Sequence, residues 1–212
     1  MVRVKVCGMM TRDDVEVCVQ AGVDAVGFIF APGPRRLSLE VAQNLTKLVP
    51  PFVTSVGIFA GNDAAFIHNV LKHCRLDVLQ FSDGEASEFC GSFGRPTIVV
   101  VHASASSADG LPKRRDLQSA RASAVMVDSR IKNIFGGTGV LVDEKLAARL
   151  RSRSVLPFIL AGGLTPDNVA AAVKAVQPWG VDVRSGVERR GRKDRRLVER
   201  FVREARNGRG AR

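Results

Sequence analysis

Two residues that can exchange protons stand at the ends of short apolar runs. Cys7 directly follows the run at 2–6, and Asp128 is the last residue of the run at 124–128. A thiolate can accept a proton and a carboxylic acid can donate one. The pair therefore suits an aldose–ketose isomerisation, in which a carbon loses a proton and a ring oxygen gains one. The competing interpretations are that Cys7 is an inert buried side chain and that Asp128 only caps a turn.

Two glycine-containing turns follow the last two apolar runs. Gly162 and Gly163 precede a helix-like segment that starts near Thr165, and Ser185-Gly186 follows the next run. Glycine lets backbone N–H groups approach an anion closely, and a helix N-terminus adds a favourable dipole. The two turns together indicate a phosphate site. The alternative is that these glycines serve only to make tight turns.

Apolar runs of similar length recur at near-even spacing along the chain. They are rich in Val, Ile and Phe, as are strands that are buried on both faces. Segments with helical periodicity lie between them, several with cap signals such as Ser38 and Asp63. The strand-like runs are 2–6, 24–30, 53–59, 76–81, 97–101, 124–128, 155–160 and 179–183, and the helix-like segments are 12–21, 38–48, 62–74, 85–92, 114–122, 143–151, 166–176 and 194–206.

Eight alternations of strand and helix in 212 residues predict an α/β protein with a single-domain (β/α)8 barrel, a TIM barrel. We expect the barrel over residues 1–207 and a basic tail at 208–212. An open doubly wound sheet is the competitor, but it usually has fewer strands, and no G-x-G-x-x-G follows the first run. In a TIM barrel the active site lies at the C-terminal ends of the strands, with phosphate bound by the last two loops. Cys7, Asp128 and both glycine turns fall at such ends.

The net charge of +11 is concentrated near the C-terminus. Residues 184–212 contain 12 arginines and lysines against 4 acidic residues. Nucleic-acid binding would account for such an excess, but Phe201 is the only aromatic residue of this segment that could stack on a base. We therefore expect a solvated helix face and no nucleic-acid partner.

The cysteines indicate a reducing compartment. They form no C-x-x-C pair and no cluster with zinc-ligand spacing. Disulfides are the alternative, but the sequence shows neither a secretion signal nor an apolar run of membrane-spanning length. We expect free thiols, cytoplasmic localisation, no metal and no membrane partner. The cysteines are Cys7, Cys18, Cys74 and Cys90.

The motifs together resemble the phosphoribosylanthranilate isomerase family of tryptophan biosynthesis. The resemblance runs nearly end to end and lies in VKVCGMMTRDD, GVDAVGFIFAPGPRRLS, VGIFAGN, GGTG, ILAGGLTPDNV and GVDVRSGVERRGRKD. It implies a cofactor-free TIM barrel, either a monomer or a homodimer. It also implies the Amadori rearrangement of N-(5-phosphoribosyl)anthranilate, a small phosphorylated substrate, to 1-(2-carboxyphenylamino)-1-deoxyribulose 5-phosphate.

The resemblance also implies a role for each candidate site residue. Cys7 corresponds to the general base that removes the C2 proton, and Asp128 to the general acid that protonates the ring oxygen. Arg35 corresponds to the residue that contacts the anthranilate carboxylate. The implied phosphate cradle is Gly162, Gly163, Ser185 and Gly186, with Arg184 adding a charged contact where the family usually has Ser.

Several positions depart from the family pattern. Ser82 stands where the family usually has His, Val99 where it has Lys, and His102 where it has Arg. These departures keep two other hypotheses open: a related phosphosugar isomerase of altered substrate, and a barrel that binds a phosphorylated ligand without turnover. The segment 129–142 contains GGTG and is either a lid or a plain glycine linker.

Overall fold

The structure is a closed barrel of eight parallel strands. The computed structural model describes residues 1–82, 89, 91–102, 122–128 and 144–208. Each strand pairs with the next, and β1 pairs with β8 to close the sheet. This confirms the predicted TIM barrel. The strands are β1 (Arg3–Cys7), β2 (Ala25–Ile29), β3 (Thr54–Phe59), β4 (Val78–Phe81), β5 (Thr97–His102), β6 (Ala124–Asp128), β7 (Phe158–Ala161) and β8 (Gly180–Val183).

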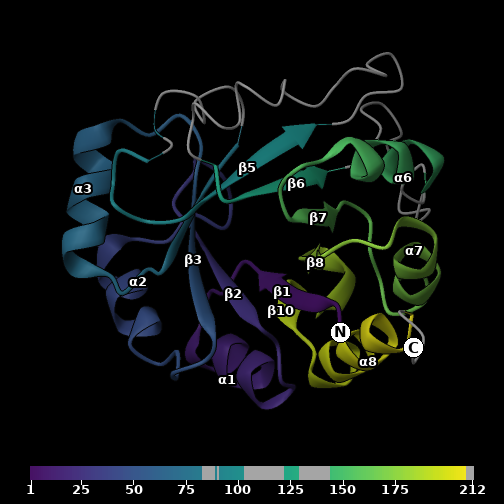
Figure 1. Cartoon of the computed structure of the whole chain (residues 1–212). Coiled ribbons are helices and arrows are strands. Elements are labelled where there is room, and N and C mark those ends of the chain that lie inside the picture. The colour runs from purple at the N-terminus through teal and green to yellow at the C-terminus, as the bar shows by residue number, and fades with distance from the viewer. Residues whose placement is uncertain (83–88, 90, 103–121, 129–143, 209–212) are drawn as a thin grey trace.

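Helices surround the barrel on its outside (Figure 1). A 3-10 turn at Ser185–Val187 and a hairpin of β9 (Glu188–Arg189) and β10 (Arg192–Lys193) lie between β8 and the last helix. In the described part of the chain, no helix is long and apolar enough to cross a membrane. The helices are α1 (Arg12–Gln20), α2 (Leu39–Thr46), α3 (Ala64–His73), α6 (Glu144–Arg153), α7 (Val169–Val176) and α8 (Arg195–Asn207).

Most predicted helices are found, and their starts follow the cap signals. Ser38 and Asp63 are N-caps, as predicted. The helix predicted at 166–176 is wrong at its start, because α7 begins at Val169. The preceding residues form a turn that Asn168 closes by accepting from the Thr165 N–H at 2.8 Å. Of the helices predicted at 85–92 and 114–122, only residues 89, 91, 92 and 122 are described, and the GGTG segment lies outside the described residues.

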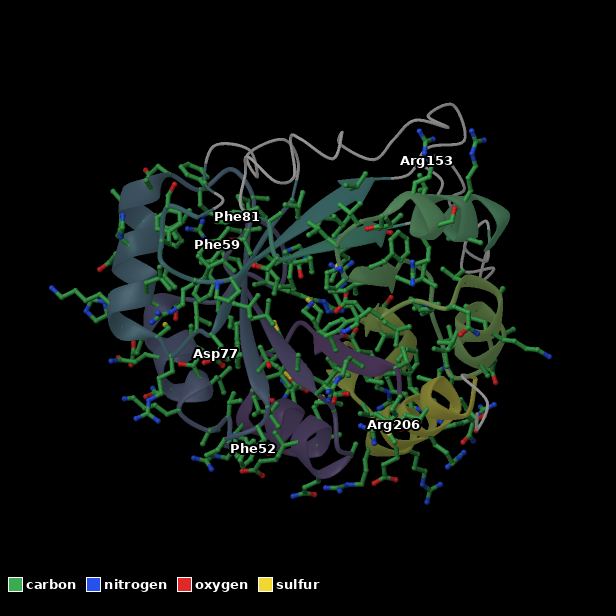
Figure 2. The ribbon with its side chains drawn as sticks, viewed as in Figure 1. Phe52, Phe59, Asp77, Phe81, Arg153 and Arg206 are labelled. Carbon is green, nitrogen blue, oxygen red and sulfur yellow. The ribbon has the colours of Figure 1, made fainter. Side chains whose placement is uncertain are left out.

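Each strand divides its side chains between two cores. Val4 and Val6 of β1 pack outward under the helices, whereas Cys7 clusters with Ile29 and Ile58 inside the barrel. The outer core includes packed aromatic rings. Figure 2 shows Phe59 beside Phe81, whose ring centroids are 5.9 Å apart. This alternation follows from the two-residue period of a strand and determines which side chains reach the site.

Asp14 ties the loop after β1 to the C-terminal hairpin. The residue is buried, and its Oδ2 accepts from the backbone of Met10 and Thr11 at 3.0 and 3.1 Å. The Thr11 hydroxyl accepts in return from the Asp14 N–H, which completes a capping box at the start of α1. Asp14 Oδ1 accepts from the Lys193 N–H at 3.1 Å. One carboxylate thus fixes both the first loop and the hairpin.

We expect Asp14→Ala to lower the free energy of unfolding by about 2–3 kcal/mol, because it removes a cap and leaves buried N–H groups without an acceptor. Asp13→Ala is the matched control, since Asp13 is exposed in the same helical turn. Its effect should stay within about 0.5 kcal/mol. Urea denaturation followed by circular dichroism measures both. Equal effects of the two substitutions would contradict the anchoring role of Asp14.

Candidate active site

A cavity of about 350 Å³ opens at the C-terminal ends of the strands. Both candidate proton-transfer residues and both glycine turns border it. It therefore gathers, from strands far apart in sequence, nearly all the residues that the sequence indicated. The predicted residues on its wall are Cys7, Asp128, Gly162, Gly163, Arg184, Ser185 and Gly186.

A larger cavity, of about 470 Å³, lies at the opposite end of the barrel. Phe52 and Trp179 border it and are exposed; Figure 2 shows Phe52 at the periphery of the molecule. Arg3 on its wall is paired with Asp24 at 2.9 Å. In TIM barrels the N-terminal end serves stability and the C-terminal end serves chemistry. The smaller, more polar cavity is therefore the candidate active site.

Cys7 is buried at the end of β1, with only 6% of its surface exposed. Its neighbour in register on β2 is Gly27. A Cβ at Gly27 would lie 3.1 Å from the Cys7 Sγ and 2.9 Å from Ile58 Cδ1. The absence of a side chain there gives the thiol its place inside the barrel. Cys18 and Cys74 are also buried free thiols, as predicted, whereas Cys90 lies outside the described residues.

Burial raises the pKa of the Cys7 thiol above its ordinary value, since a thiolate loses its hydration there. Three cations act in the opposite direction, first Lys5 and then Lys193 and Arg184, whereas the Asp182 carboxylate adds to the rise. The net effect is a thiol that ionises at higher pH than a free cysteine.

Asp128 lies at the end of β6, three strands from β1 around the closed sheet. It is half-buried and stands beside Ala161 of β7 in register. Cys7 and Asp128 thus face one cavity from different parts of its wall. A small molecule in the cavity can contact both groups at once.

The loops after β7 and β8 are pressed together. Gly162 and Gly163 have positive φ values of 94° and 65°, which glycine adopts without strain. The Asn168 side chain donates to the Gly163 carbonyl at 3.0 Å. A Cβ at Gly186 would lie 1.9 Å from the Leu164 carbonyl oxygen. Backbone from two loops therefore converges on one rim of the cavity.

Arg35 does not border the cavity, in contrast to the other predicted site residues. Its guanidinium forms a two-bond ion pair with Glu188, with Nη2–Oε2 at 2.5 Å and Nη1–Oε1 at 3.3 Å. It still lies next to the site, because a Cβ at Gly8 would contact both Arg35 and Arg184. Arg35 is thus held at the edge of the cavity by the β9–β10 hairpin.

The positions that depart from the family pattern differ in their relation to the site. Ser82 borders the cavity. Val99 is buried in the outer core under the helices, so its replacement of a lysine does not alter the wall of the cavity. His102 is in register with Asp128 across β5 and β6.

Two buried lysines near Cys7 were not among the predicted site residues. Lys5 Nζ contacts Asp182 Oδ1 at 2.6 Å. Lys193 Nζ donates to the carbonyls of Cys7 and Arg184 at 2.6 and 3.1 Å and to Glu188 Oε1 at 2.7 Å. Lys5 stands one inward position before Cys7, which is a signal that could have been used. No sequence pattern links Lys193 to Cys7, because the two residues are 186 positions apart. Among the described residues, no group of His, Cys, Asp and Glu is arranged to hold a metal ion.

Comparison with known proteins places the chain in one family. The family model described as N-(5'phosphoribosyl)anthranilate (PRA) isomerase matches residues 4–204. An N-(5'-phosphoribosyl)anthranilate isomerase from Thiobacillus denitrificans is 44% identical over 207 residues, which are 96% of this chain and 98% of the relative.

Two solved structures of phosphoribosylanthranilate isomerases are also similar to this chain. One is a phosphoribosyl anthranilate isomerase in complex with reduced 1-(o-carboxyphenylamino)-1-deoxyribulose 5-phosphate, with a TM-score of 0.78 and 31% identity over 97% of this chain and 99% of the other. The second, from Thermotoga maritima, shows monomers generated from a dimeric phosphoribosylanthranilate isomerase, with a TM-score of 0.77, 30% identity and the same coverage. The chain belongs to the N-(5'-phosphoribosyl)anthranilate isomerase family.

Proposed function

We propose that the protein rearranges N-(5-phosphoribosyl)anthranilate in the cavity at the C-terminal ends of the strands, the C-terminal cavity. In this proposal Cys7 is the general base and Asp128 the general acid. The isomerase activity and its place in tryptophan biosynthesis follow from the family. The observation that carries the assignment of residues is that Cys7 and Asp128 border one cavity whose rim is formed by the two glycine loops. A small phosphorylated sugar fits this arrangement, with its phosphate at the loops and its ring between the two side chains.

The first step is ring opening. Asp128, as a carboxylic acid, donates its proton to the furanose ring oxygen. The bond from that oxygen to C1 breaks, and the lone pair of the anthranilate nitrogen forms a C1=N iminium. The neutral acid Asp128 becomes a carboxylate, and the ring-opened substrate, which has gained the proton, carries the matching positive charge at its iminium nitrogen. The half-buried position of Asp128 on β6 supports this role, because the group meets both substrate and solvent.

The second step is proton removal from C2. The Cys7 thiolate takes this proton, an S–H bond forms, and the C–H electron pair becomes the C1=C2 double bond while the iminium nitrogen becomes neutral. The resulting enolamine loses its O2 proton and gains one at C1, which gives the aminoketose. Exchange with solvent returns Cys7 and Asp128 to their starting protonation states, so the reaction is a net isomerisation.

The phosphate and carboxylate ends of the substrate find separate partners. The convergent backbone at Gly163 and Gly186 supports phosphate binding, and the exposed Arg184 on the same rim adds a positive charge. The Arg35 guanidinium has five N–H donors, and two of them are hydrogen-bonded to the Glu188 carboxylate. Its remaining donors are available for the anthranilate carboxylate.

The proposed residues all come from one chain. A monomer and a homodimer are therefore both compatible with the chemistry, and light scattering of the purified protein distinguishes them. A cytoplasmic enzyme is the corresponding expectation for localisation, which fractionation of cells tests.

Cys7→Ser and Asp128→Asn should each lower kcat by about 10²–10⁴-fold with little change in KM, because both groups act mainly in the transition state. Single-turnover assays with fresh substrate, followed by the loss of anthranilate fluorescence, measure this. Cys18→Ala is the control, since burial raises the pKa of that thiol to about 12 and it packs in the core. If Cys7→Ala turns over substrate at the wild-type rate, the assigned base is wrong and a non-catalytic role for Cys7 follows.

The raised pKa of Cys7 predicts where activity is lost on acidification. A base is active only when deprotonated, so kcat/KM should fall as the pH drops through the pKa of Cys7 in the free enzyme. This acidic limb should lie above the ordinary cysteine value of about 8.5. Rate measurements from pH 6 to 10, on the order of ten points, test it. A limb well below that value would contradict burial as the dominant influence.

Gly186→Ala should weaken phosphate binding, because the new Cβ would push the two glycine loops apart. Loss of one hydrogen bond to a charged group costs about 1.5–3 kcal/mol, so KM and the inhibition constant of inorganic phosphate should rise roughly tenfold or more. Gly191→Ala is the control for general destabilisation, since its φ of 77° disfavours alanine but the residue does not border the cavity. Unchanged phosphate inhibition in Gly186→Ala would place the phosphate elsewhere.

A further inference from the structure

A buried ion pair lies in the barrel interior, among the residues that the structure describes. Lys5 and Asp182 are in register on β1 and β8, and their side chains are only 6% and 12% exposed. Most of the surrounding interior is apolar, including Val56, Met126 and Ile159. Removing two charges from water is costly, and replacing such a pair by apolar residues often leaves a protein equally or more stable. Its presence here therefore suggests a role in the chemistry.

The ion pair lies next to Cys7 in the barrel interior, on the side toward the N-terminal ends of the strands. Lys5 precedes Cys7 by two residues on the same strand, so both side chains point into the barrel. Lys5 borders the larger cavity at the opposite end of the barrel, the N-terminal cavity, and Asp182 borders the C-terminal cavity. The salt bridge thus lies between the two cavities, one inward-facing position before the thiol along β1.

The other charged groups near Cys7 are less suited to stabilising a thiolate. Arg184, directly after β8, is exposed, so water screens its charge. Lys193 of β10 is buried, but its ammonium already donates to three oxygens. Asp182 is negatively charged, so it disfavours the thiolate. Lys5 is the buried cation that Asp182 holds at 2.6 Å, two residues before Cys7 on the same strand, and its charge favours the thiolate more than that of Lys193 or Arg184.

We infer that Lys5, anchored by Asp182, is the positioning residue that stabilises the thiolate form of Cys7 inside the barrel. This inference rests on the proposed role of Cys7 as base. Lys5 stays protonated throughout and exchanges no proton with the substrate. When Cys7 takes the C2 proton, the S–H bond forms and the C–H bond breaks, and the negative charge that Lys5 stabilised disappears. The neutral Lys5–Asp182 pair then remains, and the thiolate forms again when Cys7 releases its proton to solvent.

The test measures the thiolate directly, apart from turnover. Iodoacetamide alkylates only the thiolate, and mass spectrometry of the Cys7 peptide gives its rate as a function of pH. In Lys5→Met the midpoint of this profile should move upward by about one pH unit or more, so that alkylation near pH 8 is roughly tenfold slower. In the same variant kcat should fall by a similar factor, with KM nearly unchanged. Lys47→Met, an exposed lysine, is the control that should match the wild type.

Chemical rescue tests whether the charge itself matters. Lys5→Ala leaves space at the N-terminal cavity, which Lys5 borders. Ethylammonium chloride should restore both alkylation and kcat in this variant, whereas sodium chloride at the same ionic strength should not. Circular dichroism of each variant verifies folding, and Lys5→Gln serves in place of Lys5→Met if the latter does not fold.

An unchanged alkylation profile in folded Lys5→Met or Lys5→Gln would overturn the role of Lys5. That result is distinct from failure of the proposed function, which would appear as wild-type turnover in Cys7→Ala. An alkylation shift without a fall in kcat would likewise overturn the inference, because the thiolate would then not limit the reaction.

Discussion

The pairing of β1 with β8 is the contact on which the site depends. It joins the first and last strands of the barrel and places Lys5 opposite Asp182. The same pairing brings the end of β1, with its thiol, next to the loop that begins at Arg184. An open sheet with the same strands would leave Cys7 at an edge, away from the two glycine loops. Closure thus creates the cavity as well as the core.

Burial and reactivity oppose each other at Cys7. The barrel interior protects the thiol from water, but it also disfavours the charged form that accepts a proton. Cationic groups on β1, on β10 and in the loop after β8 partly offset this effect, and the two buried ones, Lys5 and Lys193, are each paired with a carboxylate. The site therefore consists of a reactive group surrounded by paired charges, and those partners sit on strands distant in sequence.

Much of the fold and part of the site could be predicted from the sequence. The eight apolar runs specify the strands because buried parallel strands need continuous apolar residues. Since TIM barrels place chemistry at strand ends, the same runs pointed to Cys7 and Asp128. The Arg35–Glu188 pair could not be foreseen, because it joins residues 153 positions apart through side-chain conformations that only the closed barrel determines. The start of α7 was missed because Asn168 stabilises a turn in place of the first helical residues.

The hydrogen bond from Lys193 to the Cys7 carbonyl has a consequence for synthesis of the chain. It joins positions 186 residues apart. A ribosome-bound chain that ends before β8 presents β1 as an unpaired edge strand and leaves the Cys7 thiol without its cover. The Cys7 thiol is thus synthesised early and enclosed last. During translation the same thiol that the finished barrel encloses is open to oxidants and to other nascent chains.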